Sequence, residues 1–295
     1  MPKVKSNGIE IEYESLGNPG DRPIVLIMGL GMHLIGWPDG FCKLLTDRGY
    51  RLIRFDNRDM GLSSKIDAAG VPKIFGVMND VAEGKQPVVP YLIRDMAADT
   101  AGLMDALNIP AAHIVGVSMG GMIAQALTIE YPHKVRSLIS IMSTTGRADL
   151  PPPEQEVLVE MMKLPKEREA AIQQMMILER VLTGPVFPFE EERSRDYSTR
   201  AHDRCYHRPG FARQFAAIIA SPSRCDALKS IKTPALVIHG NRDPLVNIEG
   251  GKDAARCIPG ARFLEIDGMG HYLSTQAWPA ITDAIVELVR EVDGI

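Results

Sequence analysis

Short apolar runs alternate along the chain with longer stretches in which apolar residues recur at helical spacing. The runs have the length and the Val, Ile and Leu content of strands that are buried on both faces. They cover residues 24–28, 52–56, 111–117, 135–142, 234–240 and 262–266. Helical spacing covers residues 39–49, 92–107, 121–127, 248–257 and 276–292. This alternation predicts an α/β fold with a mostly parallel central sheet and helices on both of its faces.

Three segments depart from this alternation. Residues 9–14 alternate apolar and polar side chains, which predicts an N-terminal antiparallel strand with a polar face. Residues 63–90 carry several Pro and Gly residues, and we expect them to be irregular. Residues 144–232 begin with a Pro-rich stretch and lack strand-like runs. We expect this third segment to be a helical cap, or lid, inserted after the sixth strand, so that 1–143 and 233–295 form the core domain.

The composition is that of an ordinary globular protein with a large core. The chain has 295 residues, of which 45% are hydrophobic, and 33 basic against 37 acidic residues. The formal charge of -4 and the lack of a basic cluster with interleaved aromatic residues argue against nucleic-acid binding. The first residues lack the apolar segment of a signal peptide, and the longest apolar runs are too short for a membrane span. We therefore expect a cytoplasmic protein.

The spacing of cysteines and histidines predicts no metal site. Cys42, Cys205, Cys225 and Cys257 are scattered and form no C-x-x-C pair. This pattern favours reduced thiols with a structural role over a disulfide framework. No histidine stands at metal-ligand spacing from another carboxylate or thiol. We expect the protein to use neither a metal nor a cofactor.

One pentapeptide, residues 116–120, reads Gly-Val-Ser-Met-Gly and lies between a predicted strand and a predicted helix. In a nucleophile elbow of this G-x-S-x-G form, the turn is so tight that the serine takes a strained backbone conformation and its neighbours must be small. The turn directs the serine hydroxyl out of the sheet. Ser118 is therefore the candidate nucleophile.

A serine hydroxyl becomes reactive only with a base to take its proton and a carboxylate to orient that base. Asp243 follows the predicted strand 234–240, and His271 follows the predicted strand 262–266. Both therefore lie at the carboxyl edge of the sheet, beside Ser118. We expect the three to form a catalytic triad. Asp267 is the competing carboxylate, but its place at a strand end favours a role in the turn.

Acyl transfer also requires hydrogen-bond donors for the oxyanion that develops on the attacked carbonyl. The backbone N–H of Met119, directly after the serine, is one candidate. The second is the N–H of Leu30, because the glycines at 29 and 31 allow the backbone after the strand 24–28 to turn inward. Relief of crowding is the alternative explanation for these two glycines.

These residues together resemble the α/β-hydrolases over nearly the whole chain, including the family's order of Ser, Asp and His. The resemblance rests on Met28-Gly29-Leu30-Gly31, on residues 56–63, on the elbow, and on Asp243 and His271. Many members have His-Gly in place of Met28-Gly29 and glycine in place of Asp59. Both departures are similar to the branch that contains aclacinomycin methylesterase, and residues 204–214 add a weaker likeness. The resemblance implies an α/β-hydrolase core and a serine carboxylesterase, without fixing the ester.

The expected reaction is cleavage of a small-molecule carboxylic ester through an acyl-enzyme intermediate. Lactonase, carbon-carbon bond hydrolase and perhydrolase activities use the same triad and stay open as alternatives. Outside the enzymes, the alternative is a non-catalytic ligand receptor that retains the pocket. The sequence leaves a homo-oligomer open.

Met and Phe side chains of the insertion are candidates for an apolar roof that sets the size of the substrate, since methionine suits adaptable pockets. The alternative for each of them is packing within the insertion itself. They are Met161, Met162, Met175, Met176, Phe187, Phe189 and Phe211.

Overall fold

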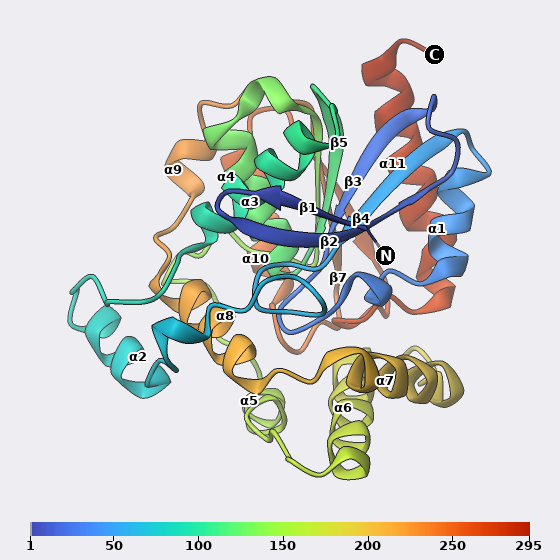
Figure 1. Ribbon diagram of the computed structural model, residues 1–295. Coiled ribbons are helices and arrows are strands. Elements are labelled where there is room, and N and C mark those ends of the chain that lie inside the picture. The colour runs from blue at the N-terminus through green and yellow to red at the C-terminus, as the bar shows by residue number, and fades with distance from the viewer. Residues whose placement is uncertain (1) are drawn as a thin grey trace.

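An eight-stranded sheet runs through the middle of the molecule in the computed structural model, which describes residues 2–295 (Figure 1). The strands are β1 (Lys3–Ser6), β2 (Ile9–Leu16), β3 (Arg22–Ile27), β4 (Tyr50–Phe55), β5 (Ala112–Val117), β6 (Val135–Ile141), β7 (Ala235–Gly240) and β8 (Arg262–Ile266). Their order in the sheet is β1-β2-β4-β3-β5-β6-β7-β8. The neighbouring strands from β4 to β8 pair in parallel, whereas β2 pairs antiparallel with both β1 and β4.

Helices cover both faces of this sheet. The core helices are α1 (Asp39–Thr46), α3 (Ile93–Ala106), α4 (Met119–Glu130), α10 (Ile248–Cys257) and α11 (Trp278–Asp293). In Figure 1, α1 and α11 lie to the right of the strands and α3 and α4 to the left. Short 3-10 turns at Leu34–Gly36, Asp67–Ala69, Pro132–Lys134 and Thr275–Ala277 complete the connections. The α/β class, the mostly parallel sheet and the flanking helices predicted from the sequence are confirmed.

The central strands are apolar on both sides because both sides are covered. All six residues of β5 are buried. Ile114 packs into the apolar cluster beneath α3 and α4, whereas Val115 and Val117 pack into the cluster beneath α1 and α11. Successive side chains of a strand point to opposite faces, so a strand between two helix layers needs apolar residues at every position.

The chain near the N-terminus and after β4 holds two elements that the sequence analysis did not anticipate. β1 forms an antiparallel hairpin with β2. Helix α2 (Ile74–Ala82) lies inside the stretch 63–90, which was expected to be irregular. That expectation is wrong because α2 is stabilised by packing outside its own sequence: its buried Val77 contacts Ala216 and Ala220 of the insertion.

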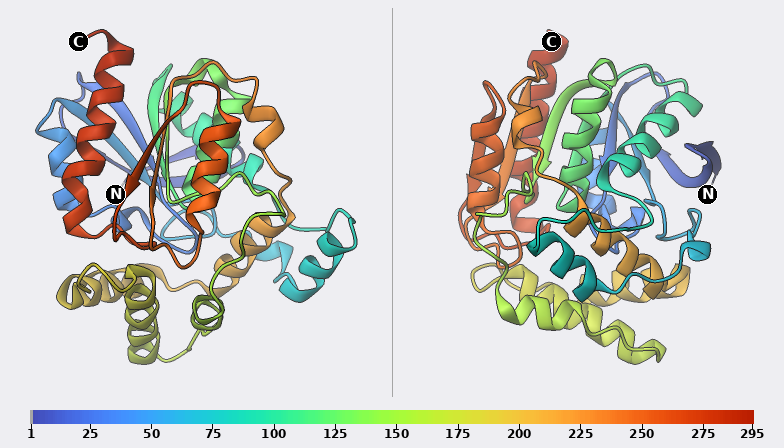
Figure 2. Two further views of the ribbon diagram at one scale, coloured as in Figure 1. Left: turned by 180° about the vertical axis from the view of Figure 1, so that it is seen from behind. Right: turned by 90° about the vertical axis from the view of Figure 1, so that its left-hand side faces the viewer.

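Between β6 and β7 the chain forms helices rather than strands, as expected. These are α5 (Gln155–Met161), α6 (Arg168–Thr183), α7 (Glu191–Cys205), α8 (Arg208–Ala220) and α9 (Cys225–Leu228). Helices α5, α6 and α7 lie beyond one end of the sheet in all views (Figures 1 and 2). The short helix α9 instead lies against α4 and α10 of the core. Within residues 2–295, no helix has the length and apolar character that crossing a bilayer requires.

Two buried ion pairs attach the insertion to the core. Arg204, in α7, lies 2.7 Å from a carboxylate oxygen of Asp56. Arg213, in α8, donates to both oxygens of Asp59, at 2.8 and 2.7 Å, and the Tyr91 hydroxyl donates to Asp59 at 2.6 Å. Asp59 takes a positive φ of 71°, a conformation that favours glycine. The departure from glycine at this position therefore provides the carboxylate that binds Arg213.

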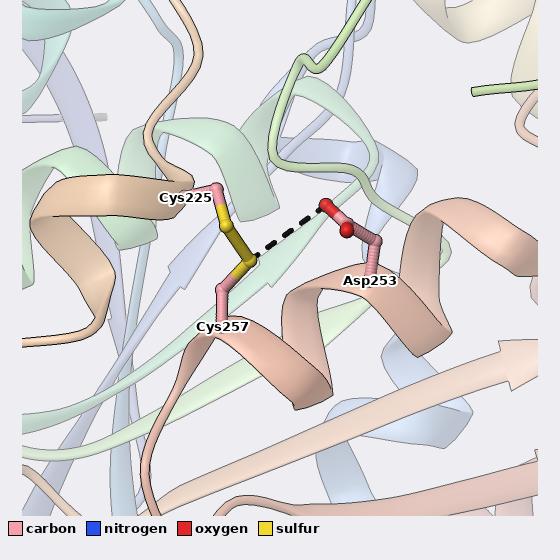
Figure 3. A group of neighbouring side chains, drawn as sticks. All are labelled: Cys225, Asp253 and Cys257. Atoms are coloured by element: carbon pink, nitrogen blue, oxygen red, sulfur yellow. Dashed lines mark hydrogen bonds between the residues drawn. A yellow bond between two sulfur atoms is a disulfide. The ribbon is translucent and has the colours of Figure 1, made fainter. Parts of the chain in front are cut away.

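A disulfide joins Cys225, at the start of α9, to Cys257, at the end of α10 (Figure 3). The expectation that all cysteines are reduced is therefore wrong for this pair, whereas Cys42 and Cys205 are free. Cys225 and Cys257 are 32 residues apart in the sequence, and nothing in the sequence indicates that they are in contact. Only the packing of α9 on α10 brings the two sulfur atoms together.

Removing this disulfide should destabilise the protein. In the chain-entropy model a loop of this length is worth about 4 kcal/mol, so Cys225→Ala/Cys257→Ala should lower the free energy of unfolding by about that amount. Urea unfolding with and without reductant measures the difference. As the control, reductant should leave the double variant unchanged; an equally stable wild type under reducing conditions would contradict the prediction.

Breaking the pair between Asp59 and Arg213 should also be costly, because both side chains are buried. We expect Asp59→Asn to lower the free energy of unfolding by up to about 3 kcal/mol. The buried guanidinium then keeps only the largely exposed carboxylate of Asp67, 2.8 Å away, as its countercharge. The matched control is Asp203→Asn, which removes the exposed partner of Arg168 and should leave the urea midpoint unchanged. Equal midpoints for both variants would refute this assignment.

Candidate active site

Ser118 occupies a tight turn between β5 and α4, with φ 56° and ψ -121°. Its N–H donates to the carbonyl of Ile141 at 2.9 Å, and the Ser143 hydroxyl donates to the carbonyl of Ser118 at 2.8 Å. The turn has no room for larger neighbours. A Cβ atom at Gly116 would lie 2.1 Å from the Gly120 carbonyl oxygen, and one at Gly120 would lie 2.0 Å from the Ile27 oxygen. The local geometry is that of the expected elbow.

A chain of hydrogen bonds links Ser118 to His271 and Asp243. His271 Nε2 lies 2.9 Å from Ser118 Oγ, and His271 Nδ1 lies 2.7 Å from Asp243 Oδ2. An ionised carboxylate can only accept, so the proton of the imidazole belongs on Nδ1, and Nε2 is left to accept the proton of the serine hydroxyl. The structure thus brings together the three side chains that the sequence singled out.

The surroundings of Asp243 keep it ionised. Burial by itself raises the pKa of this carboxyl, but His271 and His239 together lower it to about 2. The backbone N–H groups of Leu245 and Val246 donate to its other oxygen at 2.9 and 2.8 Å. A carboxylate with these donors cannot turn away from the imidazole without losing several hydrogen bonds.

The side chain of Asp267, the competing carboxylate, binds Asn241 and not the imidazole of His271. It accepts a hydrogen bond from the Asn241 side chain at 2.9 Å, and the same amide donates to Glu265. Asn241 also accepts from the N–H of Gly268 at 2.9 Å. Asp267 therefore belongs to the network that shapes the turn after β8, in the role preferred for it from the sequence.

Several contacts around the site had no clear signal in the sequence. His239 Nε2 lies 3.2 Å from Asp243 and 2.7 Å from the carbonyl of Val246. The carbonyl of Leu182, at the end of α6, accepts from the N–H of His271 at 2.7 Å. Gln214, in α8, accepts from the N–H of Gly31 at 2.9 Å. Of these contacts, the sequence indicates only that of His239, because its strand β7 leads directly to Asp243.

The two predicted oxyanion donors belong to backbone segments that lie next to the serine. A Cβ atom at Gly29 would lie 3.3 Å from the Ser118 Cβ and 3.7 Å from its Oγ, so the backbone leading into Leu30 passes directly beside the hydroxyl. Met119 is the first residue of α4, and an N–H in the first turn of a helix has no acceptor within that helix. The role of both N–H groups stays a prediction.

A cavity of about 1000 Å³ opens in front of Ser118 and His271, between the sheet and the insertion. Of the proposed roof, Met161, Met175 and Phe211 line this cavity. Met162 is largely exposed to solvent, and Met176 is buried in packing contacts, so neither belongs to the roof. Further methionines line the cavity from outside the insertion, namely Met28, Met32, Met60, Met78, Met122 and Met142.

Phe187 and Phe189 do not contribute to the roof. Phe187 packs against the apolar cluster beneath α1 and α11, and the guanidinium of Arg180 lies 4.5 Å from the ring centroid of Phe189. Residues 78, 81 and 82 of α2 line the cavity as well. The apolar wall is therefore built jointly by α2, the core loops and the insertion.

Most of the exposed area of this wall is apolar, but charged side chains line the cavity as well, among them Arg147, Glu160, Lys163 and Arg193. His33 is buried, and burial lowers its pKa to about 4, so the imidazole is neutral. Glu179, in α6, is also buried, and burial raises its pKa to about 7. The site as a whole offers an alcohol that can be deprotonated by a neutral imidazole, next to a large apolar cavity. Such an arrangement can attack an electrophilic carbon and transfer an acyl group.

Comparisons with known proteins agree with this geometry. The family model described as the alpha/beta hydrolase fold matches residues 22–276. Rhodomycin D methylesterase of Streptomyces peucetius is 28% identical to this chain over 309 residues, covering 97% of each protein.

Solved structures show the same arrangement of elements. A meta-cleavage product hydrolase from Pseudomonas fluorescens IP01 superposes with a TM-score of 0.76 at 20% identity, over 99% of this chain and 98% of that one. An enol-lactonase from Burkholderia xenovorans LB400 superposes with a TM-score of 0.72 at 25% identity, over 98% of this chain and 99% of that one.

Proposed function

Because the chain belongs to the family of the alpha/beta hydrolase fold, we propose that it is a serine hydrolase that cleaves carboxylic esters through Ser118, His271 and Asp243. The family expected from the sequence motifs is confirmed. The observation that carries the proposal is the unbroken chain of hydrogen bonds from Asp243 through His271 to Ser118. The methylesterase activity in the name of the Streptomyces relative supports an ester as the substrate.

In the proposed mechanism, Ser118 Oγ attacks the ester carbonyl carbon while His271 Nε2 takes the hydroxyl proton. Asp243, ionised because its pKa is about 2, stabilises the imidazolium that forms. The N–H groups of Leu30 and Met119 are assigned to the negative oxygen of the tetrahedral intermediate. The intermediate collapses as His271 gives its proton to the leaving alcohol.

Water completes the cycle. His271 takes a proton from a water molecule, whose oxygen attacks the acyl-enzyme carbonyl. The second tetrahedral intermediate expels Ser118 Oγ, which recovers its proton from His271, and the carboxylic acid leaves. The net reaction is ester plus water to acid plus alcohol, with no cofactor in the balance.

The insertion is assigned the role of a lid domain, with residues 1–143 and 233–295 as the catalytic core. Its contacts support this role: α6 accepts a hydrogen bond from the His271 N–H, and α8 holds the loop that carries Leu30. A cavity of about 1000 Å³ with a largely apolar wall suits an ester with a bulky apolar part. The methyl ester of a bulky acid is one such substrate.

Lactone and carbon-carbon bond hydrolysis are the second candidate activities, because the structural relatives include an enol-lactonase and a meta-cleavage product hydrolase. Perhydrolase chemistry on the same triad stays open. Kinetics with matched esters, lactones and vinylogous diketones distinguish these activities. We further propose that the enzyme is cytoplasmic and acts on a small dissolved substrate. The Cys225–Cys257 disulfide is unusual for that compartment. Reduced thiols at both positions in freshly lysed cells would therefore support the location, and an intact disulfide would contradict it.

Ser118→Ala should lower kcat for a short-chain aryl ester by about 10⁴-fold or more, because no other group takes over the attack. In parallel, an alkyl fluorophosphonate should label the wild type at Ser118 and leave the variant unlabelled, as read by mass spectrometry. Heat-unfolded wild type is the control for non-specific labelling. Equal ester turnover by the two proteins, or absence of an adduct on the folded wild type, would favour a non-catalytic receptor.

Asp243→Asn should lower kcat by about 10⁴-fold, because the amide stabilises the wrong imidazole tautomer. The matched control is Asp267→Asn, the same change on the competing carboxylate. Asp267 is bound to Asn241 instead of the imidazole, so its variant should retain kcat. A larger loss in Asp267→Asn than in Asp243→Asn would reverse the assignment of the orienting carboxylate.

A further inference from the structure

Buried carboxylates in this protein have positively charged or imidazole partners, with one exception. The pairs are Glu12–Arg204, Asp56–Arg204, Asp59–Arg213, Asp99–Arg58, Asp243–His271 and Asp253–Arg147. Glu179 is just as buried, at 6% exposure, yet no Lys, Arg or His in the described chain lies within ion-pair distance of it. A buried carboxyl without a countercharge is unfavourable, so its retention needs a reason.

The neighbours of Glu179 do not supply that countercharge. The Tyr272 hydroxyl donates to it at 3.3 Å, a long hydrogen bond. The Ser194 hydroxyl also lies close enough to lower the pKa of Glu179, but neither hydroxyl carries a positive charge. Arg193 attracts Glu179 from a distance, but its guanidinium binds Glu190 and the carbonyl of Leu273. It also lies over the Tyr272 ring, 4.7 Å from the centroid. Arg193 is thus held in its own contacts and leaves the carboxyl of Glu179 without an ion pair.

Glu179 faces the place where a substrate would lie. It lines the cavity together with His271 and Tyr272. The helix that carries it, α6, ends over the proposed catalytic histidine, because the carbonyl of Leu182 accepts from the N–H of His271. Leu182 follows Glu179 by about one helical turn, roughly 5 Å along the axis. Glu179 therefore belongs to the wall of the cavity and lies outside the proposed triad.

The phenol groups around Glu179 stay uncharged through the neutral pH range. Burial is the largest cause that raises the pKa of the phenols of Tyr272 and Tyr197, and Glu179 raises both further. These phenols are neutral in this range. Glu179 is then the group in this cluster whose charge changes near neutrality, because burial raises its pKa to about 7.

We propose that Glu179 binds a positively charged group, an ammonium or alkylated ammonium, on the ester substrate. This inference rests on the proposed esterase function and adds to it the class of substrate. The incoming cation completes the ion pair that every other buried carboxylate has within the protein. The carboxyl and the Tyr272 hydroxyl oxygen accept hydrogen bonds from an ammonium, or make direct contact with an alkylated ammonium that has no N–H group. The apolar wall binds the remainder of the ester. Glu179 is a binding residue, with no part in the covalent steps.

The test uses pairs of esters that differ only in charge. Each pair has an alcohol ending in trimethylammonium and its neutral isostere ending in tert-butyl, over a series of alkyl spacers. The trimethylammonium charge does not titrate, so the ratio of kcat/KM within a pair isolates recognition of charge. For the spacer that fits, the wild type should prefer the cationic ester by roughly tenfold or more, as expected for a desolvated charge pair.

Glu179→Gln should bring this ratio close to one, because glutamine keeps the size and loses the charge. The matched control is Glu160→Gln, which neutralises another glutamate of the cavity wall, one that already has Lys163 as its partner. We expect the control to keep the wild-type ratio. A ratio near one in the wild type for every spacer, or an undiminished ratio in Glu179→Gln, would overturn the inference.

The pH dependence gives a second readout that needs no variant. Glu179 carries its charge above a pH of about 7 and loses it below. The preference of the wild type for the cationic ester should therefore rise between about pH 6 and about pH 8. A pH effect on the proposed triad acts on both esters of a pair alike and cancels in the ratio. A ratio that falls or stays flat across this range would count against Glu179.

Failure of the proposed function is distinguishable from failure of this inference. If neither ester of any pair is cleaved, the esterase proposal fails. The cation site at Glu179 is then tested by binding measurements alone. Alkyltrimethylammonium ions should then bind the wild type roughly tenfold more tightly than Glu179→Gln in calorimetry. Equal affinities would refute the site, whereas cleavage of neutral esters without charge preference would refute the site and keep the esterase.

Discussion

The close approach of α4 to β3 is the constraint on which the site depends. Gly120 packs its backbone against the carbonyl of Ile27, where a Cβ atom would overlap the oxygen. This contact forces the turn at Ser118 into a strained conformation, which the surrounding hydrogen bonds to Ile141 and Ser143 maintain. The same approach brings Gly29 beside the serine. One packing contact thus sets the direction of the nucleophile and the path of the loop that carries Leu30.

The insertion contributes to the site as well as covering it. Its helix α6 accepts the N–H of His271, and its helix α8 accepts the N–H of Gly31 through Gln214. Both loops that converge on Ser118 are therefore tied to the same set of helices. Because Arg204 and Arg213 bind that set to Asp56 and Asp59 of the core, a displacement of the insertion would disturb buried ion pairs and the reactive loops together.

The partners around a buried carboxyl decide whether it is charged in this protein. Asp243 lies among donors and two imidazoles, which hold it ionised, whereas Glu179 lies in an apolar wall, which favours its protonated form. The pKa values of these two buried carboxyls are shifted in opposite directions. Such a difference separates a group that orients the proposed base from one that is available to a ligand.

The sequence by itself determined the order of the strands from β2 to β8 and of the core helices, the elbow turn, and the choice of Asp243 and His271 as candidates. Apolar periodicity and loop position after parallel strands are local or topological properties. The tertiary structure decided what depends on packing between distant segments. Helix α2, the Cys225–Cys257 disulfide and the contacts of Leu182 and Gln214 all join residues whose separation along the chain carries no periodic signal. The burial of Glu179 belongs to the same class, since an isolated carboxyl on a helix reads as solvent-exposed until a second layer covers it.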